Sequence, residues 1–276
     1  METVWYYDRD LMRALLISLL LAVVIGACST VPGTGRTQIL LLGRGEEMQL
    51  GAQAYTEMLA QERIITSGSD AAMVQRIGER IAQSAIDLLP DSDAKRFDWE
   101  FKLIDAPDMA NAWALPGGKT AVYTGLLPIT GDEDSLAAVM GHEVAHAIAR
   151  HGNERMSHGM VLQLGMLGAD MGTRDMDPGD RDMIMAGLGV GANLGIMLPF
   201  SRSHESEADE IGLMLAANAG YNPEAAVGLW QRMGAASSGA PPEWLSTHPS
   251  SETRIRRLQE LMPEANKLYR RALKNR

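Results

Sequence analysis

The chain carries an HExxH sequence at residues 142–146, in the middle of an apolar run from Ser135 to Arg150. In an α-helix His142 and His146 lie on one face, about 40° apart around the axis and about 6 Å apart along it, so one metal ion can contact both rings. Glu143 is then placed to take a proton from a metal-bound water molecule. The pattern therefore predicts a helix with a catalytic zinc site. The alternative is a chance match, with both histidines facing solvent on an ordinary amphipathic helix.

The apolar surroundings of the motif argue against a chance match. Most of the remaining positions in this run are Leu, Ala, Val, Met or Ile, so we expect the helix to be buried. Buried polar side chains are costly without partners, and a metal ion supplies one. Thr130 and Glu133 have the spacing of a capping box at the start of the helix, and Gly152 can end it. His151 then falls near the C-terminal end, where we expect it to cap the helix or support a ligand rather than bind the ion.

A third metal ligand is expected from a second segment of the chain. A catalytic zinc ion takes three protein ligands and leaves one position for water. Downstream, Glu205 and Asp209 lie four residues apart and share a helix face, whereas Glu207 points in another direction. The spacing alone leaves open which carboxylate completes the site, and the alternative for Glu205 is an exposed charge on a helix surface.

Together, the two segments resemble peptidase family M48, the zinc metallopeptidases that include the HtpX protease and the CAAX prenyl protease. The family pattern is HExxH followed by Ser-Arg and Glu-x-x-Ala-Asp, which stand here as Ser201-Arg202 and residues 205–209. The resemblance runs from about Gln38 to the end of the chain. It implies a zincin-like metallopeptidase domain.

The resemblance also implies a role for each polar side chain of these segments. His142, His146 and Glu205 would hold one Zn²⁺ ion per chain. Glu143 would be the catalytic residue, acting first as base and then as acid. Asp209 would orient a ligating imidazole from behind.

A further match covers residues 111–118 and 123–126. It resembles the asparagine-initiated strand and hairpin of the Oma-like, single-domain members of the family, which include bacterial lipoproteins. We expect this strand to accept an extended substrate as an added strand, because main-chain pairing makes little demand on substrate sequence. The strand residues are Asn111, Ala112, Trp113 and Ala114.

His248 lies in a Thr-His-Pro sequence between a Gly/Ser/Pro-rich loop and a basic helix. A lone histidine is most often a surface residue or a satisfied core residue. Relatives in the family carry a histidine in a matching His-Pro sequence near the active site. The resemblance therefore implies that His248 touches the zinc site, where it would either occupy the fourth position on the ion and silence the enzyme or stabilise the oxyanion.

The remaining periodicity predicts an α+β fold that is mostly helical. Apolar residues recur at helical spacing in 46–63 and 71–89. Residues 97–103 alternate between apolar and polar, which predicts a strand. Residues 111–115 and 120–124 flank a Pro-Gly-Gly-Lys turn and predict a hairpin. We therefore expect a small β-sheet packed against the HExxH helix.

The sequence predicts the structure of two further regions less specifically. Residues 160–171 and 183–200 are apolar and rich in Met and Gly, with an acidic stretch between them. In residues 183–200, Asn193 and the interior glycines argue against a membrane span, so we predict a buried or loosely packed helix there. Residues 253–276 are basic and predict a solvated helix, the alternative being contact with an anionic membrane surface.

The N-terminal part predicts export and lipid attachment. Residues 1–27 have the layout of a lipoprotein-type signal peptide, with a true start possible at Met12 and an apolar run shorter than the roughly 20 residues of a membrane span. Cys28 would be lipidated, which anchors the chain to a membrane. The alternative is an uncleaved membrane anchor. Residues 28–45 would form a lipidated, flexible tether, and residues 46–276 the metallopeptidase domain.

These features lead to one expected function with two alternatives. A net charge of −10 argues against a nucleic-acid partner. We expect an outer-membrane lipoprotein at the periplasmic face of a bacterial envelope, and a zinc endopeptidase that hydrolyses unfolded or misfolded envelope proteins. One alternative is a non-proteolytic, chaperone-like zinc lipoprotein that aids outer-membrane assembly. The other is a structural lipoprotein with a fortuitous zinc pattern. The oligomeric state is not indicated.

Overall fold

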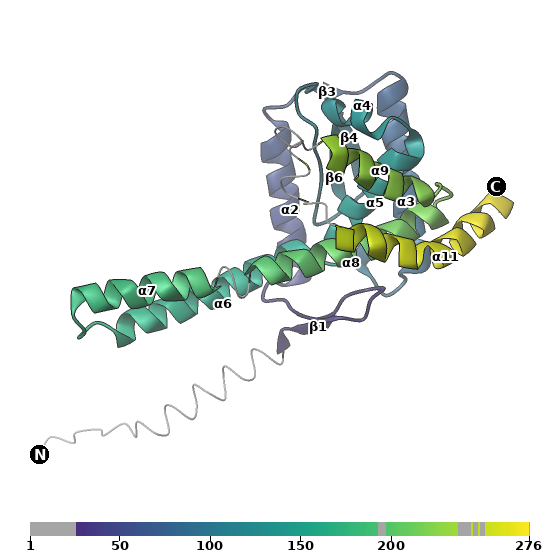
Figure 1. The fold of residues 1–276 in the computed structure, drawn as a ribbon. Coiled ribbons are helices and arrows are strands. Elements are labelled where there is room, and N and C mark those ends of the chain that lie inside the picture. Colours follow the sequence, from purple (N-terminus) through teal and green to yellow (C-terminus); the bar gives the residue numbers. More distant parts are fainter. Residues whose placement is uncertain (1–25, 193–196, 237–243, 245–247, 249–251, 276) are drawn as a thin grey trace, which may run out of the picture.

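The computed structural model describes residues 26–192, 197–236, 244, 248 and 252–275 (Figure 1). The predicted signal peptide lies outside the described residues, apart from its last two positions. Among the described helices none combines the length and the apolarity that crossing a bilayer needs.

A four-stranded sheet forms one layer of the molecule, in the order β3-β4-β6-β5. Its strands are β3 (Ile64–Ile65), β4 (Glu100–Ile104), β5 (Ala112–Leu115) and β6 (Lys119–Tyr123). β4 and β6 run parallel, and the other neighbouring strands run antiparallel. The predicted hairpin is thus confirmed as β5 and β6, and the predicted strand as β4. β5 lies at an edge of the sheet.

Helices make up most of the described chain (Figure 1). They are α2 (Arg44–Leu59), α3 (Ser69–Leu88), α4 (Leu127–Thr130), α5 (Glu133–Ile148), α6 (His151–Gly172), α7 (Pro178–Ala192), α8 (Leu198–Asn218), α9 (Glu224–Ala236) and α11 (Glu252–Lys274), with 3-10 turns η1 (Asp93–Arg96) and η2 (Thr124–Leu126). α3 packs on β4 and α5 on β5, α8 packs on both helices, and α11 packs on α8 and α9. The predicted α+β fold is confirmed.

The HExxH motif lies on α5, but the predicted ends of this helix are wrong. Asp132 is the N-cap in place of Thr130, and its side chain accepts a hydrogen bond from the Ser135 amide at 2.7 Å. The helix ends at Ile148, and Arg150, not Gly152, has the left-handed conformation with φ 61°. The physical reason is tertiary, because Arg150 donates from Nε to the buried Glu47 carboxylate at 2.7 Å.

Two glycines let α5 and α8 approach each other at backbone distance. A Cβ atom on Gly141 would lie 2.7 Å from the Gly212 carbonyl oxygen, and one on Gly212 would lie 2.7 Å from the Gly141 carbonyl carbon and the His142 amide nitrogen. Only glycine fits at both positions without moving a helix. This crossing places the acidic positions of α8 beside the histidines of α5.

The N-terminal hairpin consists of β1 (Cys28–Thr30) and β2 (Thr37–Ile39), which pair antiparallel. The prediction of a flexible tether is wrong for this segment. Val31 is buried in the main core, and Arg36 forms ion pairs with Glu154 on α6 and Glu207 on α8. These long-range contacts fix a stretch whose Pro and Gly content is typical of a linker.

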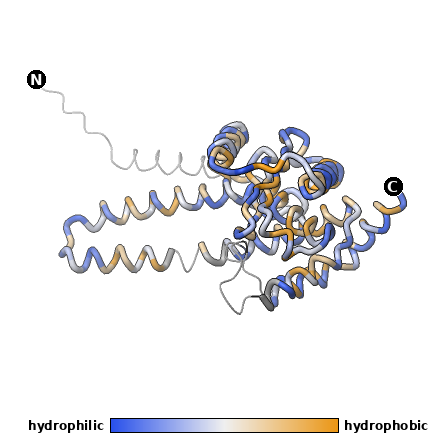
Figure 2. Tube along the Cα trace, turned by 90° about the horizontal axis from the view of Figure 1, so that it is seen from above, coloured by the Kyte–Doolittle hydropathy of each residue, from blue (hydrophilic) through white to orange (hydrophobic). Residues whose placement is uncertain are grey.

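α6 and α7 form a second hairpin, which projects from the body of the molecule (Figures 1 and 2). Of the two alternatives predicted for residues 183–200, a buried or a loosely packed helix, the buried one is wrong for residues 183–190, because most apolar side chains there are exposed. Most apolar side chains of α6 are exposed as well. The strongly exposed ones in the hairpin are Met156, Met160, Val161, Leu164, Leu167, Met171, Met176, Met183, Ile184, Leu188 and Val190. The acidic stretch lies at the tip, where residues 174–180 are exposed.

Candidate metal centre

Four side chains bring possible ligand atoms to one point. His142 and His146 on α5, Glu205 on α8, and His248 each offer an atom within 4.8 Å of all the others. The structure therefore brings together the predicted ligands, although Glu205 follows His146 by more than fifty positions. The crossing of α5 and α8 makes this possible.

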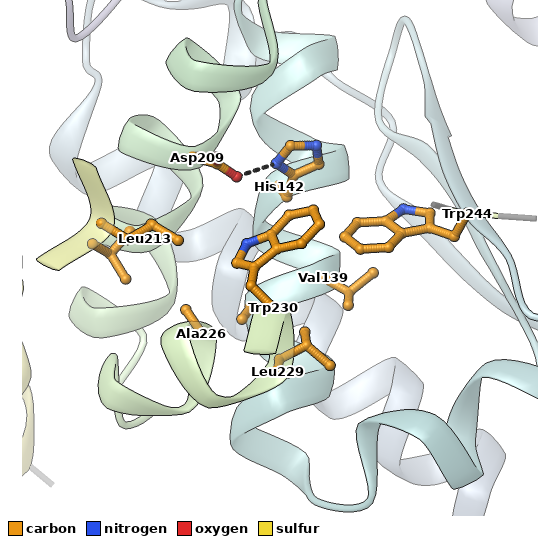
Figure 3. Close-up of a pocket in the computed structure, with 10 residues that line it drawn as sticks. Val139, His142, Asp209, Leu213, Ala226, Leu229, Trp230 and Trp244 are labelled. Carbon is orange, nitrogen blue, oxygen red and sulfur yellow. Dashed lines mark hydrogen bonds and ion pairs between the residues drawn. The ribbon is translucent and has the colours of Figure 1, made fainter. Parts of the chain in front are cut away.

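The imidazole of His142 is hydrogen-bonded through its Nδ1 atom. Nδ1 of His142 lies 3.0 Å from Oδ1 of Asp209, in the position predicted for an orienting carboxylate (Figure 3). Burial raises the pKa of Asp209, but the hydrogen bonds and charges of Arg254 and His142 together outweigh this and lower the pKa below its usual value. An ionised carboxylate only accepts, so Nδ1 of His142 carries a proton and Nε2 is the ring nitrogen that would bind a metal ion.

The donor atoms have the separations that a small divalent ion needs. Nε2 of His142 lies 3.1 Å from Nε2 of His146 and 3.3 Å from Oε2 of Glu205, and Nε2 of His146 lies 3.5 Å from Oε1 of Glu205. Two nitrogens bound tetrahedrally to one zinc ion at about 2.0–2.1 Å lie roughly 3.3 Å apart. Facing lone pairs at such distances repel unless a cation lies between them. The residues therefore fit a zinc ion.

The charge balance of the cluster supports this fit. Burial lowers the pKa of His146 well below its usual value, and the neighbouring imidazoles lower it further. Burial raises the pKa of Glu205, but the hydrogen bonds from His142 and His248 and the charges of His142 and His146 together outweigh it and lower the pKa, so Glu205 stays ionised. Burial lowers the pKa of His142, but Asp209 and Glu205 together outweigh it and raise the pKa to about 9, so the carboxylates favour a positive charge here, which a bound cation would supply in place of a proton. The centre thus offers imidazole nitrogens and a carboxylate, which are ligands that zinc prefers.

Glu143 lies in the same pocket and is held by a side chain that the sequence did not point to. Oε1 of this buried carboxylate accepts a hydrogen bond from Nε1 of Trp244 at 2.6 Å. The Trp244 indole stacks on that of Trp230, with ring centres 5.0 Å apart, below His142 (Figure 3). Nothing in the Gly/Ser/Pro-rich stretch around Trp244 signals this contact.

Arg254 is a second residue that sequence reasoning missed. It donates from Nε and Nη2 to the Asp209 carboxylate at 2.6 and 2.7 Å, and its Nη1 lies 3.2 Å from Oε2 of Glu205. Its guanidinium also lies 4.0 Å from the centre of the Trp230 ring. The prediction of a solvated basic helix is therefore wrong at Arg254, which is 4% exposed. The basic pattern of α11 does not distinguish it from its exposed neighbours.

A cleft of about 430 Å³ opens beside the metal ligands. Its lining includes Glu143, His146 and His248, and also Ala114 and Leu115 of the edge strand β5. The other predicted strand residues are engaged within the fold. The Asn111 side chain accepts from the Ala112 amide at 2.9 Å, Ala112 is buried, and Trp113 donates to the Tyr123 hydroxyl at 3.3 Å.

Comparisons with known proteins agree with this geometry. Residues 69–262 match Peptidase family M48. The chain is 37% identical over 240 residues to the mitochondrial metalloendopeptidase OMA1 of Schizosaccharomyces pombe, covering 85% of this chain and 66% of that protein. It is 33% identical over 248 residues to the human mitochondrial metalloendopeptidase OMA1, covering 86% and 46%. It is 26% identical over 261 residues to the beta-barrel assembly-enhancing protease of Escherichia coli K12, covering 90% and 52%. The chain thus spans about half to two thirds of the length of these relatives.

Proposed function

Because the chain belongs to peptidase family M48, we propose that it is a zinc-dependent endopeptidase that cleaves extended or unfolded polypeptides. The observation that carries the proposal is the convergence of His142, His146 and Glu205 beside Glu143, at the wall of an open cleft. A structural metal site would be closed on all sides, whereas this one borders a space that a peptide can enter.

Each residue of the centre has a distinct task. His142, His146 and Glu205 would hold the ion, which when bound polarises the scissile carbonyl and lowers the pKa of a bound water to about 7. Glu143 takes the proton of the attacking water and delivers it to the leaving amine. The indole N–H of Trp244 holds the Glu143 carboxylate toward the ligands, since a Trp side chain can only donate.

His248 would take the fourth position in this form of the protein. Its Nδ1 lies 2.9 Å from Oε2 of Glu205 and 3.2 Å from Nε2 of His142, which is ligand spacing. Its Nε2 lies 3.6 Å from Oε1 of Glu143, where the attacking water would need space. The geometry therefore favours the silencing role over oxyanion stabilisation, and His248 must withdraw before a substrate can react.

The substrate would bind along β5. Among the described strands β5 pairs with β6 alone, and its residues Ala114 and Leu115 line the cleft together with Glu143. A peptide added as a strand there would satisfy its main chain and pass the ligands with little demand on sequence. Extended or unfolded segments can do this, whereas folded domains cannot.

We also propose a location at the periplasmic face of a bacterial envelope, through a lipid on Cys28, with misfolded envelope proteins as substrates. Cys28 is exposed at the start of β1, where a lipid is sterically possible. The sequence before it has the signal-peptide layout, and one relative is named a beta-barrel assembly-enhancing protease. Labelling of cells with a radioactive fatty acid tests the location, since Cys28→Ala should abolish incorporation.

Cleavage of unfolded β-casein by the full chain tests the activity. We expect Glu143→Gln to lose at least about 100-fold in rate while retaining zinc, because the proton acceptor is lost but the ligands remain. A chelator should abolish wild-type cleavage. Glu264→Gln, at an exposed position on α11, is the matched control and should cleave normally. Cleavage by Glu143→Gln at the wild-type rate would contradict the role of Glu143, whereas zinc binding without any cleavage by the wild type would contradict the proposal and favour a chaperone-like role.

A further inference from the structure

A row of buried side chains joins the ligand His146 to the N-terminal hairpin. His151, the first residue of α6, has Nδ1 at 2.8 Å from Nδ1 of His146 and Nε2 at 3.0 Å from Oε2 of Glu207. Glu207 lies on α8, and its Oε2 accepts from Nε and Nη2 of Arg36 at 2.9 and 2.8 Å. Thr34 donates to the other Glu207 oxygen. The row thus runs from the metal centre to the loop between β1 and β2.

The proton positions along this row follow from the ligand at one end. His146 presents Nε2 to the donor cluster, so its proton is on Nδ1 and is donated to Nδ1 of His151. A neutral His151 that accepts at Nδ1 carries its own proton on Nε2, which it donates to Glu207. Glu207 then has to be an acceptor at Oε2. The hydrogen bonds from His146 to His151 and from His151 to Glu207 therefore both point away from the metal centre, and Glu207 accepts from Arg36 on its other side.

Arg36 supplies the positive charge at the far end. Its Nη1 and Nη2 donate to both oxygens of Glu154 at 2.8 and 2.7 Å, while Nε and Nη2 bond Glu207. Both carboxylates are buried, and buried charges need such pairing. Glu154 also lies 2.9 Å from Nε2 of His204, whose ring stacks on that of His151 at 4.2 Å. Hydrogen bonds thus hold His151 at both ring nitrogens, and the His204 ring packs against one of its faces.

The two ligating imidazoles are supported in parallel ways from opposite ends of the chain. His142 is backed by Asp209, which Arg254 of the C-terminal helix α11 holds. His146 is backed by His151 and Glu207, which Arg36 of the N-terminal hairpin holds. Outer partners of this kind fix the tautomer and direction of a ligand.

We infer that His151, Glu207 and Arg36 are positioning residues for His146, and that the N-terminal hairpin is therefore part of the metal centre. This inference rests on the proposed zinc function. Arg36 follows Cys28 by only eight positions, so the segment that would carry the lipid is connected to a zinc ligand through Glu207 and His151. Disturbing this segment should weaken metal binding without touching a ligand.

The test is zinc affinity of the full chain, measured by competition with a chromophoric chelator. We expect Arg36→Met to bind zinc about 10- to 100-fold more weakly, the usual effect of losing an outer partner. Arg44→Met, which removes an exposed ion pair with Asp93 in the same region, should change the affinity less than about threefold. Arg36→Lys, which keeps the charge, should recover part of the loss. Circular dichroism establishes that each variant is folded.

A second measurement needs no variant. Nitrogen-15 NMR of the zinc-loaded wild type reports which ring nitrogen carries each proton, and we expect Nδ1–H on His146 and Nε2–H on His151. A proton on Nδ1 of His151 would overturn the inference, as would wild-type zinc affinity in folded Arg36→Met. Failure of the wild type to bind zinc at all would contradict the proposed function, and the inference with it.

Discussion

The crossing of α5 and α8 gives a sharp prediction for Gly212→Ala. The added Cβ would lie 2.7 Å from the Gly141 carbonyl carbon and the His142 amide nitrogen, both of which are backbone atoms that cannot rotate away. Ordinary contact begins at 3.4 Å, so the helices must separate by about 0.7 Å at this point. Overpacking of this kind costs about 1–3 kcal/mol, which corresponds to a melting temperature roughly 2–12 °C lower.

The same separation moves Glu205 relative to the two histidines. A misplacement of about 1 Å can cost on the order of 100-fold in rate, so we expect peptide cleavage to fall about 10- to 100-fold. Zinc affinity should fall as well, because the ligands come from both helices. Differential scanning calorimetry, chelator competition and kcat/KM for a peptide measure these three effects.

Gly165→Ala is the matched control for this experiment. Gly165 lies within α6, and a Cβ there would meet nothing within 4 Å. The exchange should leave zinc affinity and cleavage unchanged and raise helix stability by up to about 1 kcal/mol. If Gly212→Ala melts and cleaves like the wild type, the close crossing does not position the ligands, and this reasoning is refuted.

Other expectations concern single contacts. Trp244→Phe keeps an aromatic ring but loses the indole N–H that donates to Glu143. We therefore expect kcat to fall about tenfold with zinc content unchanged, and an unchanged kcat would contradict the orienting role. Leu164→Ala, at a 66% exposed position, should change unfolding free energy by less than about 0.5 kcal/mol, whereas Leu215→Ala, at 1%, should lower it by about 2–5 kcal/mol. Burial raises the pKa of Glu154, but the hydrogen bond to Arg36 outweighs it and lowers the pKa to about 2. This stabilisation is present above pH 4.5 and lost as the pH falls toward 2, so denaturant titrations should show wild type and Arg36→Met converging over that range.

The parts of the centre that depend on local spacing could be predicted from sequence. His142, His146 and Glu143 lie within one helical turn and a half, so their relative placement follows from helix geometry. The hairpin of β5 and β6 follows from its turn residues in the same way. Glu205 required the family pattern, because helical spacing did not separate it from Asp209.

The contacts that depend on tertiary folding had no such signal. Arg36, Trp244 and Arg254 reach the centre or its support from distant segments, and each lies in a stretch of unremarkable linker, loop or basic character. Arg150 ends α5 because of a pair with Glu47, which overrides the local preference for glycine. The exposure of the α6–α7 hairpin was missed because periodicity shows which residues are apolar and does not show what covers them.

The most direct test of the central claim is to locate the metal ion. Zinc-edge X-ray absorption and anomalous diffraction on the full chain should show one ion per chain, bound by His142, His146 and Glu205, with nitrogen distances of about 2.0–2.1 Å. Glu205→Gln should weaken that binding strongly. Stoichiometric zinc bound away from these three residues, or no zinc at all, would contradict the account.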